Sequence, residues 1–161
     1  MTAHHYRLAA AWTGNTGGGT TGYRDYSRDV AVTAEGKPDL FMSADKPFRG
    51  DSTRWNPEDL LLAALSGCHL LSFLHVAVSH GMVVADYRDE ATGTMEQQGI
   101  GGRFTEVVLH PEVMFTDAGD ETPIHRLHEE AHAACFIASS VAFPVRVDPV
   151  LAVPVVVEPD K

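Results

Sequence analysis

The sequence predicts an α+β fold, with antiparallel sheets around two helices in the order βββαββαβ. Three observations favour this class: a strong helix start signal at "NPED", a second helical period nearer the C-terminus, and strand-like segments around both. The 161 residues are 44% hydrophobic and 21% charged, as in an ordinary globular protein. We expect one domain over 1–161, with a core at about 12–147 and a C-terminal strand and tail at 148–161.

Residues 6–43 are predicted to form a β-meander. The segments "YRLAAAW" (6–12) and "RDVAVTAEGKPDLFMS" (28–43) have the composition of antiparallel strands, and Gly36 and Lys37 mark a turn inside the second. The glycine-rich stretch "TGNTGGGTTG" (13–22) lies between them and is typical of a mobile loop.

A long helix is predicted to begin at Asn56, whose side chain can cap it. Pro57 suits the first helical position, and Glu58 and Asp59 place negative charge at the positive end of the helix dipole. The helix is expected to reach Gly81, which suits a left-handed cap. It is apolar on nearly all sides, yet its serine and histidine residues favour a buried helix over a membrane span. Such a helix must be covered by a sheet or by another subunit.

The remaining segments complete the predicted order. Residues 83–97 and 103–115 alternate well enough to form a hairpin across the turn "QGIGG". The segment "DETPIHRLHEEAHAACFIA" (120–138) has the 3.6-residue period of an amphipathic helix that ends near Ala138. The segment "VAFPVRVDPVLAVPVVV" (141–157) is strand-like but interrupted by prolines, so we expect an edge strand and a tail.

Charge and motif content disfavour several classes of protein. The formal net charge of −10 disfavours nucleic-acid and anionic-membrane partners, which need clustered Lys and Arg. The N-terminal sequence has no signal-peptide pattern, so a cytoplasmic protein is expected. In that compartment Cys68 and Cys135 are expected to be reduced thiols. No GxSxG or Walker motif predicts a hydrolase or a nucleotide enzyme.

Cys68 lies in the apolar run "LLLAALSGCHLL" (60–71), and the residues alone leave three interpretations open. A free cysteine in such a helix is most often a packing residue. A metal site is the second, because His128, His132 and Cys135 share a helical face and offer nitrogen and sulfur ligands. The third is a reactive thiol, which would need a cation from elsewhere because the helix N-terminus is too distant to activate it.

Two motifs, "NPEDLLLAALSGCH" (56–69) and "EEAHAACFIASSVAFPV" (129–145), together with the βββαββαβ order, resemble the OsmC/Ohr family of thiol-dependent hydroperoxide reductases. The resemblance runs from about Trp12 to Val147. The sequence departs from the family pattern at Phe136, where proline is common, and at "GYRDYSRD", which replaces a shorter arginine-containing loop.

The resemblance implies a role for four side chains. Cys68 corresponds to the thiol that attacks the peroxide, and Cys135 corresponds to the thiol that resolves the product. Glu58 corresponds to the glutamate of the NPE motif. The arginine that accompanies it is assigned to Arg28, with Arg24 as the alternative.

The expected chemistry explains why an arginine is needed. A thiolate is the nucleophile, and an apolar environment disfavours that anion unless a guanidinium, which stays charged when desolvated, lies close by. Attack by Cys68 would give a sulfenic acid, which Cys135 would convert to a disulfide. Apolar neighbours favour organic hydroperoxides as substrates, with hydrogen peroxide as a second candidate. The expected substrate pocket comprises Phe48, Trp55, Leu71 and Phe73.

Neither a metal nor an organic cofactor is expected. The predicted partners are an organic hydroperoxide as substrate and a cellular dithiol as reductant, for which a lipoyl-type dithiol is one candidate. The competing interpretation is a non-catalytic ligand-binding or redox-sensing protein on the same scaffold.

Glu58 precedes Cys68 by ten residues, which places them about 15 Å apart in a straight helix. Either the helix breaks after its first turn, or Glu58 serves Cys68 of a second chain. The latter, with an apolar helix that needs cover, predicts an intertwined homodimer, which the family resemblance also implies. His69 faces away from Cys68 and is expected to be a packed or dimer-contact residue.

Overall fold

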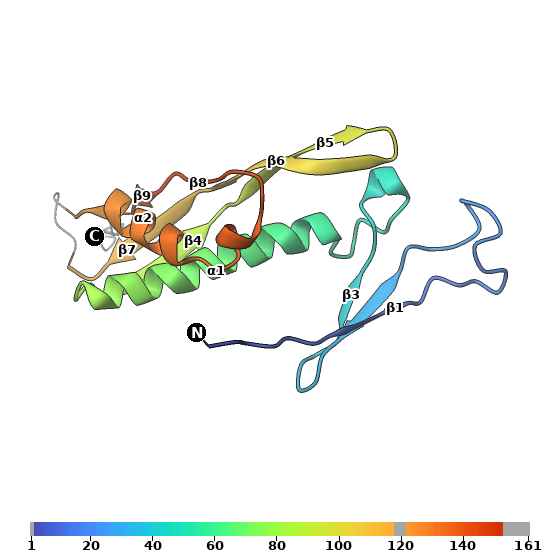
Figure 1. The fold of residues 1–161 in the computed structure, drawn as a ribbon, viewed down its shortest axis with the longest axis horizontal. Helices are drawn as coiled ribbons and strands as arrows, with labels where there is room; N and C mark the ends of the chain where they lie inside the picture. Colours follow the sequence, from blue (N-terminus) through green and yellow to red (C-terminus); the bar gives the residue numbers. More distant parts are fainter. Residues whose placement is uncertain (1, 118–121, 153–161) are drawn as a thin grey trace, which may run out of the picture. The chain divides into compact units, whose positions relative to one another are not determined.

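The long helix α1 (Pro57–Ser79) contains the boundary between two units of the structure, Met1–Leu61 and Leu62–Lys161. This computed structural model describes residues 2–117 and 122–152 (Figure 1). Each unit is described by itself below, so the expected single domain over 1–161 stays a prediction.

The first unit contains a three-stranded antiparallel sheet in the order β1-β2-β3. Its strands are β1 (Ala9–Trp12), β2 (Val30–Thr33) and β3 (Leu40–Met42), followed by the short 3-10 helix η1 (Lys46–Phe48). Trp12 pairs with Val30, and Val30 pairs with Met42. Gly36 has a φ of 72° in the turn between β2 and β3, a conformation that glycine adopts without strain. The predicted meander and its turn are therefore confirmed.

The start and the end of α1 follow the sequence signals. The side-chain oxygen of Asn56 accepts a hydrogen bond from the amide of Asp59 at 2.8 Å, which satisfies a free donor of the first turn. The helix ends at Ser79, and Gly81 follows with a φ of 71°. No interruption divides α1 between Pro57 and Ser79, so the alternative in which the helix breaks after its first turn is wrong.

The second unit contains two three-stranded sheets of mixed direction, ordered β4-β7-β9 and β5-β6-β8. The strands are β4 (Val84–Asp89), β5 (Thr92–Gln98), β6 (Gly101–Leu109), β7 (Pro111–Phe115), β8 (Val145–Val147) and β9 (Val150–Leu151). The last two strands run parallel to their neighbours and lie at sheet edges, as the prolines around them predict. The α+β class is confirmed, but each strand predicted after α1 is divided in two. The part of the predicted tail at 153–161 lies outside the described residues.

The division of the predicted hairpin has a local cause at Asp89. The Asp89 carboxylate ends β4 and accepts a hydrogen bond of 2.7 Å from the backbone amide of His110, the residue between β6 and β7. The Ser66 hydroxyl of α1 donates to the other oxygen of the same carboxylate. A side chain thus replaces a strand partner at the break and links it to α1.

The second helix, α2 (Ile124–Ala134), is shorter than predicted. Cys135 is its C-terminal cap and has an extended backbone with a φ of −78° and a ψ of 109°, so the expectation that the helix continues to Ala138 is wrong. Serine hydroxyl groups downstream bond to the carbonyls that follow the helix. Ser139 donates to the Cys135 carbonyl at 2.9 Å, and Ser140 donates to the Phe136 carbonyl at 2.7 Å. The start predicted at residues 120–121 lies outside the described residues.

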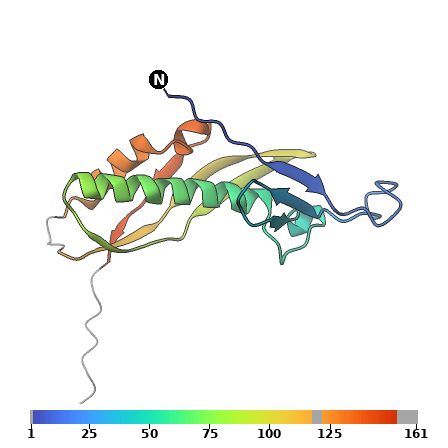
Figure 2. The ribbon, with the colours of Figure 1, turned by 90° about the horizontal axis from the view of Figure 1, so that it is seen from below.

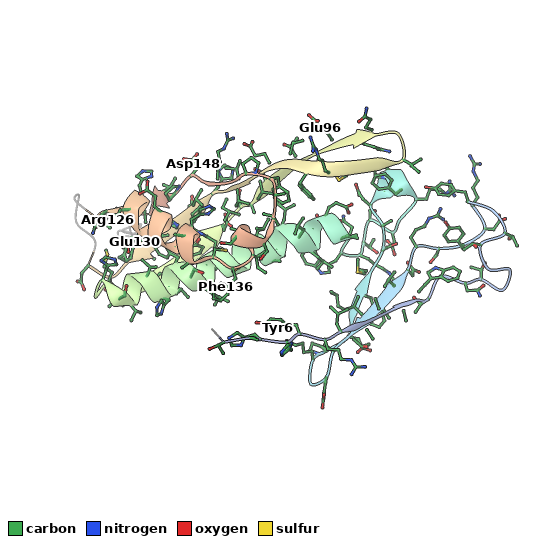
Figure 3. The ribbon with its side chains drawn as sticks, in the orientation of Figure 1. Tyr6, Glu96, Arg126, Glu130, Phe136 and Asp148 are labelled. Carbon is green, nitrogen blue, oxygen red and sulfur yellow. The ribbon has the colours of Figure 1, made fainter. Side chains whose placement is uncertain are left out.

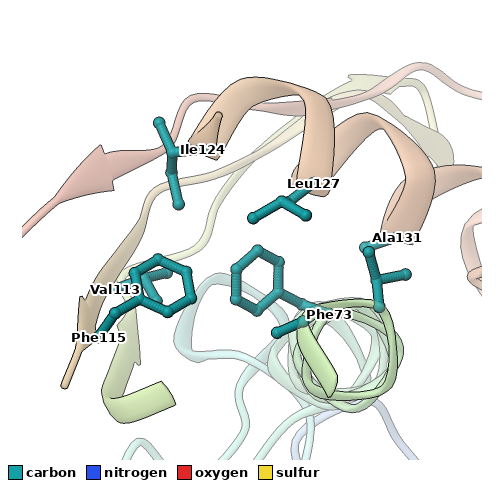
Figure 4. Close-up of a cluster of buried hydrophobic side chains, with 8 residues drawn as sticks. Phe73, Val113, Phe115, Ile124, Leu127 and Ala131 are labelled. Atoms are coloured by element: carbon teal, nitrogen blue, oxygen red, sulfur yellow. The ribbon is translucent and has the colours of Figure 1, made fainter. Parts of the chain in front are cut away.

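The core of the second unit lies where α1, α2 and β7 meet. Figures 1 and 2 show α2 beside the C-terminal half of α1. Phe73 of α1 is fully buried and faces Leu127 of α2 (Figure 4). The buried members of this cluster are Phe73, Val76, Ala77, Val113, Phe115, Ile124, Leu127 and Ala131.

α1 also leaves apolar side chains exposed in the single chain. Leu71 is 68% exposed and Val78 is 74% exposed. Within the described residues, α1 is the one helix that is long and apolar enough to cross a membrane by length and composition. Its contacts with α2 and β7 instead identify it as a core helix with one uncovered side.

We predict that Leu127→Ala lowers the free energy of unfolding by about 2–5 kcal/mol, because it opens a cavity in the core. Urea unfolding measures this loss. Ile100→Ala is the control, since this side chain is fully exposed in the turn between β5 and β6, and it should change stability by less than about 0.5 kcal/mol. Equal losses for both variants would contradict the assigned core.

Candidate functional site

The two cysteines lie together in the second unit. Cys68 is half-buried on α1, and Cys135 is fully buried immediately after α2. Both are free thiols, and the Cys68 side chain hydrogen-bonds with Cys135. Two thiols that are remote in the sequence are thus in contact, as the predicted pairing of an attacking and a resolving cysteine requires.

Burial raises the pKa of the Cys135 thiol above its ordinary value, and the hydrogen bond with Cys68 adds to the increase. Hydrogen bonds with the backbone of Ala138 and Ile137 act in the opposite direction. The protonated form of Cys135 is therefore favoured, which suits a thiol that reacts only after its partner has been oxidised.

A buried histidine pair connects α1 and α2. Nε2 of His69 on α1 lies 2.9 Å from Nδ1 of His128 on α2, and both side chains are at least 98% buried. The His128 ring also stacks on Phe73 at a centroid distance of 4.1 Å. The expectation that His69 is a packed residue is confirmed, but the sequence did not predict its partner. The available signal was the helical spacing of His125, His128 and His132, for which a metal site was one of the interpretations left open.

Desolvation lowers the pKa of both histidines, to about 4 for His69 and about 3 for His128. The positive charge of a neighbour adds to each decrease, from His132 for His69 and from His69 for His128. Asp89 opposes the decrease at His69. Both imidazoles are therefore neutral at neutral pH.

The metal interpretation of His128, His132 and Cys135 is not supported. Cys135 contacts Cys68, and Nδ1 of His128 is bonded to His69. Across residues 2–117 and 122–152, no three His, Cys, Asp or Glu side chains are arranged to hold a metal ion.

The candidate arginine lies in the first unit, where its own loop holds it. The guanidinium of Arg28 lies over the rings of Tyr23 and Tyr26, at 4.4 and 4.1 Å from their centroids. It also donates hydrogen bonds of 2.6 Å to the backbone carbonyls of both tyrosines. Arg24 is exposed in the same loop. The rings and carbonyls of Tyr23 and Tyr26 thus hold the Arg28 guanidinium within its own loop.

The other expected residues of the first unit lie around the start of α1. Glu58 is half-buried in the first turn, and its Oε2 atom is buried without a hydrogen-bond partner among the described residues. Trp55 is 55% exposed and bridges to Met42 of β3. Phe48 is half-buried at the end of η1.

The two expected pocket residues of the second unit differ in exposure. Leu71 is exposed, whereas Phe73 is fully buried in the core and stacks on His128. Phe136 points away from the unit and is 81% exposed (Figure 3). Arg126 and Glu130, also labelled there, form an ion pair of 3.8 Å on α2.

Comparison with known proteins identifies the family. A model of the family described as OsmC-like protein matches residues 50–150. The chain belongs to this family. The matched residues include Glu58, Cys68 and Cys135, whereas Arg24 and Arg28 precede them.

Solved structures of OsmC-like proteins have the same fold. A Vibrio cholerae OsmC-like protein of unknown function is 29% identical, with a TM-score of 0.81 over 92% of this chain and 100% of that one. An organic hydroperoxide resistance protein from Elizabethkingia anophelis is 21% identical, with a TM-score of 0.65 over 94% and 99%. The uncharacterised protein YmaD of Bacillus subtilis is 22% identical and aligns with 88% of this chain and 89% of its own length.

We predict that the histidine pair makes stability fall in mild acid. Because the folded-state pKa values lie below the ordinary value of 6.5, the unfolded state binds protons first as the pH decreases. The contribution of the neutral pair to the free energy of unfolding is complete above about pH 6.5. Below that pH, each histidine can lower the free energy of unfolding by up to about 1.4 kcal/mol per pH unit. Urea unfolding between pH 7 and pH 5 measures the slope.

His128→Gln should flatten this slope, and His75→Gln, at an exposed position of α1, should leave it unchanged. Parallel curves for the wild type and His128→Gln would contradict the assignment.

Proposed function

We propose that this OsmC-like protein is a cysteine-based hydroperoxide reductase. The observation that carries the proposal is the contact between the free thiols of Cys68 and Cys135. A pair of adjacent thiols can store two electrons and release them as a disulfide. The names of structural neighbours from Legionella pneumophila and Elizabethkingia anophelis, both organic hydroperoxide resistance proteins, support the same class of activity.

The proposed reaction has three balanced steps. The Cys68 thiolate attacks one peroxide oxygen, the O–O bond breaks, and a proton joins the departing alkoxide, giving a sulfenic acid and an alcohol. The Cys135 thiol then displaces water from the sulfenic acid and forms a disulfide. A cellular dithiol, for which a lipoyl-type compound is one candidate, reduces this disulfide and becomes oxidised itself.

Arg28, or Arg24 as the alternative, would stabilise the thiolate and polarise the peroxide. Contact with a thiolate would require Arg28 to exchange its bonds with Tyr23 and Tyr26 for bonds with the anion. Glu58 would orient the guanidinium, since its buried Oε2 lacks a hydrogen-bond partner among the described residues. Such charge-assisted bonds are stronger than neutral ones.

The active form in this proposal is an intertwined homodimer in the cytoplasm. Because α1 is unbroken, the ten residues between Glu58 and Cys68 span about 15 Å of regular helix, too far for a shared site within one helix. The exposed apolar residues Leu71 and Val78 supply the kind of surface that a second copy covers. Glu58 of one chain would then act beside Cys68 of the other.

We predict that one equivalent of cumene hydroperoxide removes two thiols and 2 Da from the reduced protein, as measured by thiol titration and intact mass. Cys135→Ser should instead gain 16 Da as a sulfenic acid, because its resolving thiol is missing. Cys68→Ser should keep its thiol. Unchanged thiols in the wild type would reject the peroxidase and favour the ligand-binding alternative.

Complementation tests whether the sites are shared. Glu58→Gln and Cys68→Ser chains should each be inactive alone. When they are mixed, half of the randomly formed dimers contain one chain of each kind, and each such dimer has one intact site of two. The mixture should therefore recover about a quarter of wild-type activity. The chains are co-expressed with different tags, and light scattering confirms the dimer mass. A mixture no more active than the separate variants, or a fully active monomer, would contradict the shared site.

We predict faster reaction with cumene hydroperoxide than with hydrogen peroxide, because an organic substrate is favoured by apolar side chains such as the exposed Leu71, three residues after Cys68 on α1. Burial of two additional methylene equivalents contributes about 1.6 kcal/mol, or roughly tenfold in rate. Stopped-flow second-order rate constants measure the ratio, and equal constants would count against an organic substrate.

A further inference from the structure

The two thiols of the candidate site differ in access. Cys135 is 0% exposed, whereas Cys68 on α1 is half-buried. A second copy of the chain only removes exposure, so Cys135 is inaccessible in the dimer of the proposed function as well. Cys68, by contrast, has to stay within reach of the peroxide that it attacks in that proposal. A disulfide between these residues therefore has one sulfur that a reductant from solution reaches.

Access decides which sulfur leaves when such a disulfide is reduced. In thiol–disulfide exchange, a thiolate attacks one sulfur, forms a mixed disulfide with it and expels the other sulfur as a thiolate. Attack at Cys68 makes Cys135 the leaving group. The surroundings of the Cys135 sulfur then affect the rate, because a better stabilised thiolate leaves faster.

The Cys135 sulfur has two backbone donors beside it. The amides of Ile137 and Ala138 donate hydrogen bonds to its side chain, and both bonds favour the thiolate over the thiol. The turn that supplies them is held by Ser139, whose amide and hydroxyl donate to the Cys135 carbonyl at 3.1 and 2.9 Å. Negative charge that forms on Cys135 thus meets donors that are already in place, and such charge-assisted bonds are stronger than neutral ones.

We infer that reduction of the disulfide has a fixed direction, in which the external dithiol attacks Cys68, and Cys135 leaves as a thiolate bonded to the amides of Ile137 and Ala138. The inference rests on the proposed peroxidase function and deepens it, since it names the atoms that recycle the enzyme. Ile137 and Ala138 are assigned a catalytic role through their backbone N–H groups, because these groups touch a reacting sulfur.

The steps balance when one thiol of the reductant is ionised. Its thiolate bonds to Sγ of Cys68, the bond between Cys68 and Cys135 breaks, and the electron pair of that bond stays on Cys135. The second thiol of the reductant passes its proton to the Cys135 thiolate, attacks the reductant sulfur of the mixed disulfide and closes a ring. Cys68 is released as the thiolate that the next peroxide needs. The burial of Cys135 favours the protonated form in which it ends the cycle.

Trapping the mixed disulfide tests the direction. The disulfide is formed in the wild-type protein with diamide, treated with 2-mercaptoethanol, a monothiol that closes no ring, and quenched in acid after short times. Free thiols are alkylated, and the peptides are mapped by mass spectrometry. We expect at least about tenfold more adduct on Cys68 than on Cys135, because Cys135 is inaccessible. Equal adducts, or more adduct on Cys135, would overturn the direction.

Variants with a single thiol give a second measurement that does not need the adduct to persist. Cys135→Ser and Cys68→Ser each keep one cysteine, whose reaction with 4,4′-dithiodipyridine is followed by absorbance. In the folded proteins Cys68 should react at least about tenfold faster than Cys135. In concentrated urea the two rates should become similar, because the fold no longer protects Cys135. Similar rates in the folded proteins would count against the inference.

Replacement of one amide by an ester tests the backbone donors. Ala138→lactic acid, introduced by nonsense suppression, removes the N–H group and keeps the side chain. Reduction of the disulfide by dithiothreitol should slow about tenfold, because a hydrogen bond to a charged group is lost. Formation of the Cys68 sulfenic acid should keep its wild-type rate, a difference that a general structural defect would not produce. Ala142→lactic acid, at an exposed position of the same segment, is the matched control and should slow neither step.

The outcomes separate this inference from the proposed function. Unchanged reduction of Ala138→lactic acid, or equal slowing of both steps, would overturn the role of the amides. Failure of the wild type to lose thiols to cumene hydroperoxide would overturn the peroxidase, whereas the disulfide made with diamide still reports the direction of reduction. A working peroxidase whose adduct lies on Cys135 would overturn the direction alone.

Discussion

The stacking of Phe73 on His128 holds α1 against α2, and the candidate site depends on that contact. Cys68 lies on α1 and Cys135 caps α2, so the two thiols meet only while these helices stay packed. The same contact buries His69 and brings it to His128. The same packing of α1 on α2 therefore forms the core and sets the geometry of the site. Loss of this packing would separate the two cysteines and the two histidines.

Burial favours the neutral forms of Cys135, His69 and His128, and an uncharged Cys135 suits a resolving thiol. Peroxide attack depends on a thiolate at Cys68, and the apolar helix α1 contains no Lys or Arg that could stabilise that anion. Arg28 is the proposed source of that charge, which makes the tyrosine-held loop as important to the reaction as the core.

Local sequence signals predicted most of the fold, because short-range interactions determine where helices begin and end. Asn56 and Gly81 bound α1 as expected, since capping depends on a few neighbouring atoms. The divided strands could not be predicted, because the Asp89 carboxylate that stabilises the break binds an amide 21 residues away. The pairing of His69 with His128 is equally non-local. The contact between the cysteines came from the family resemblance, which carries three-dimensional information that periodicity lacks.

Direct location of the disulfide tests the central claim, that the core brings Cys68 and Cys135 together for redox chemistry. The protein is treated with one equivalent of hydroperoxide, alkylated, digested without reduction and mapped by mass spectrometry. The account predicts one linked peptide pair, Cys68 with Cys135 of the same chain, in nearly all molecules. A Cys68 sulfinic acid beside an unmodified Cys135, or disulfides between chains, would contradict it.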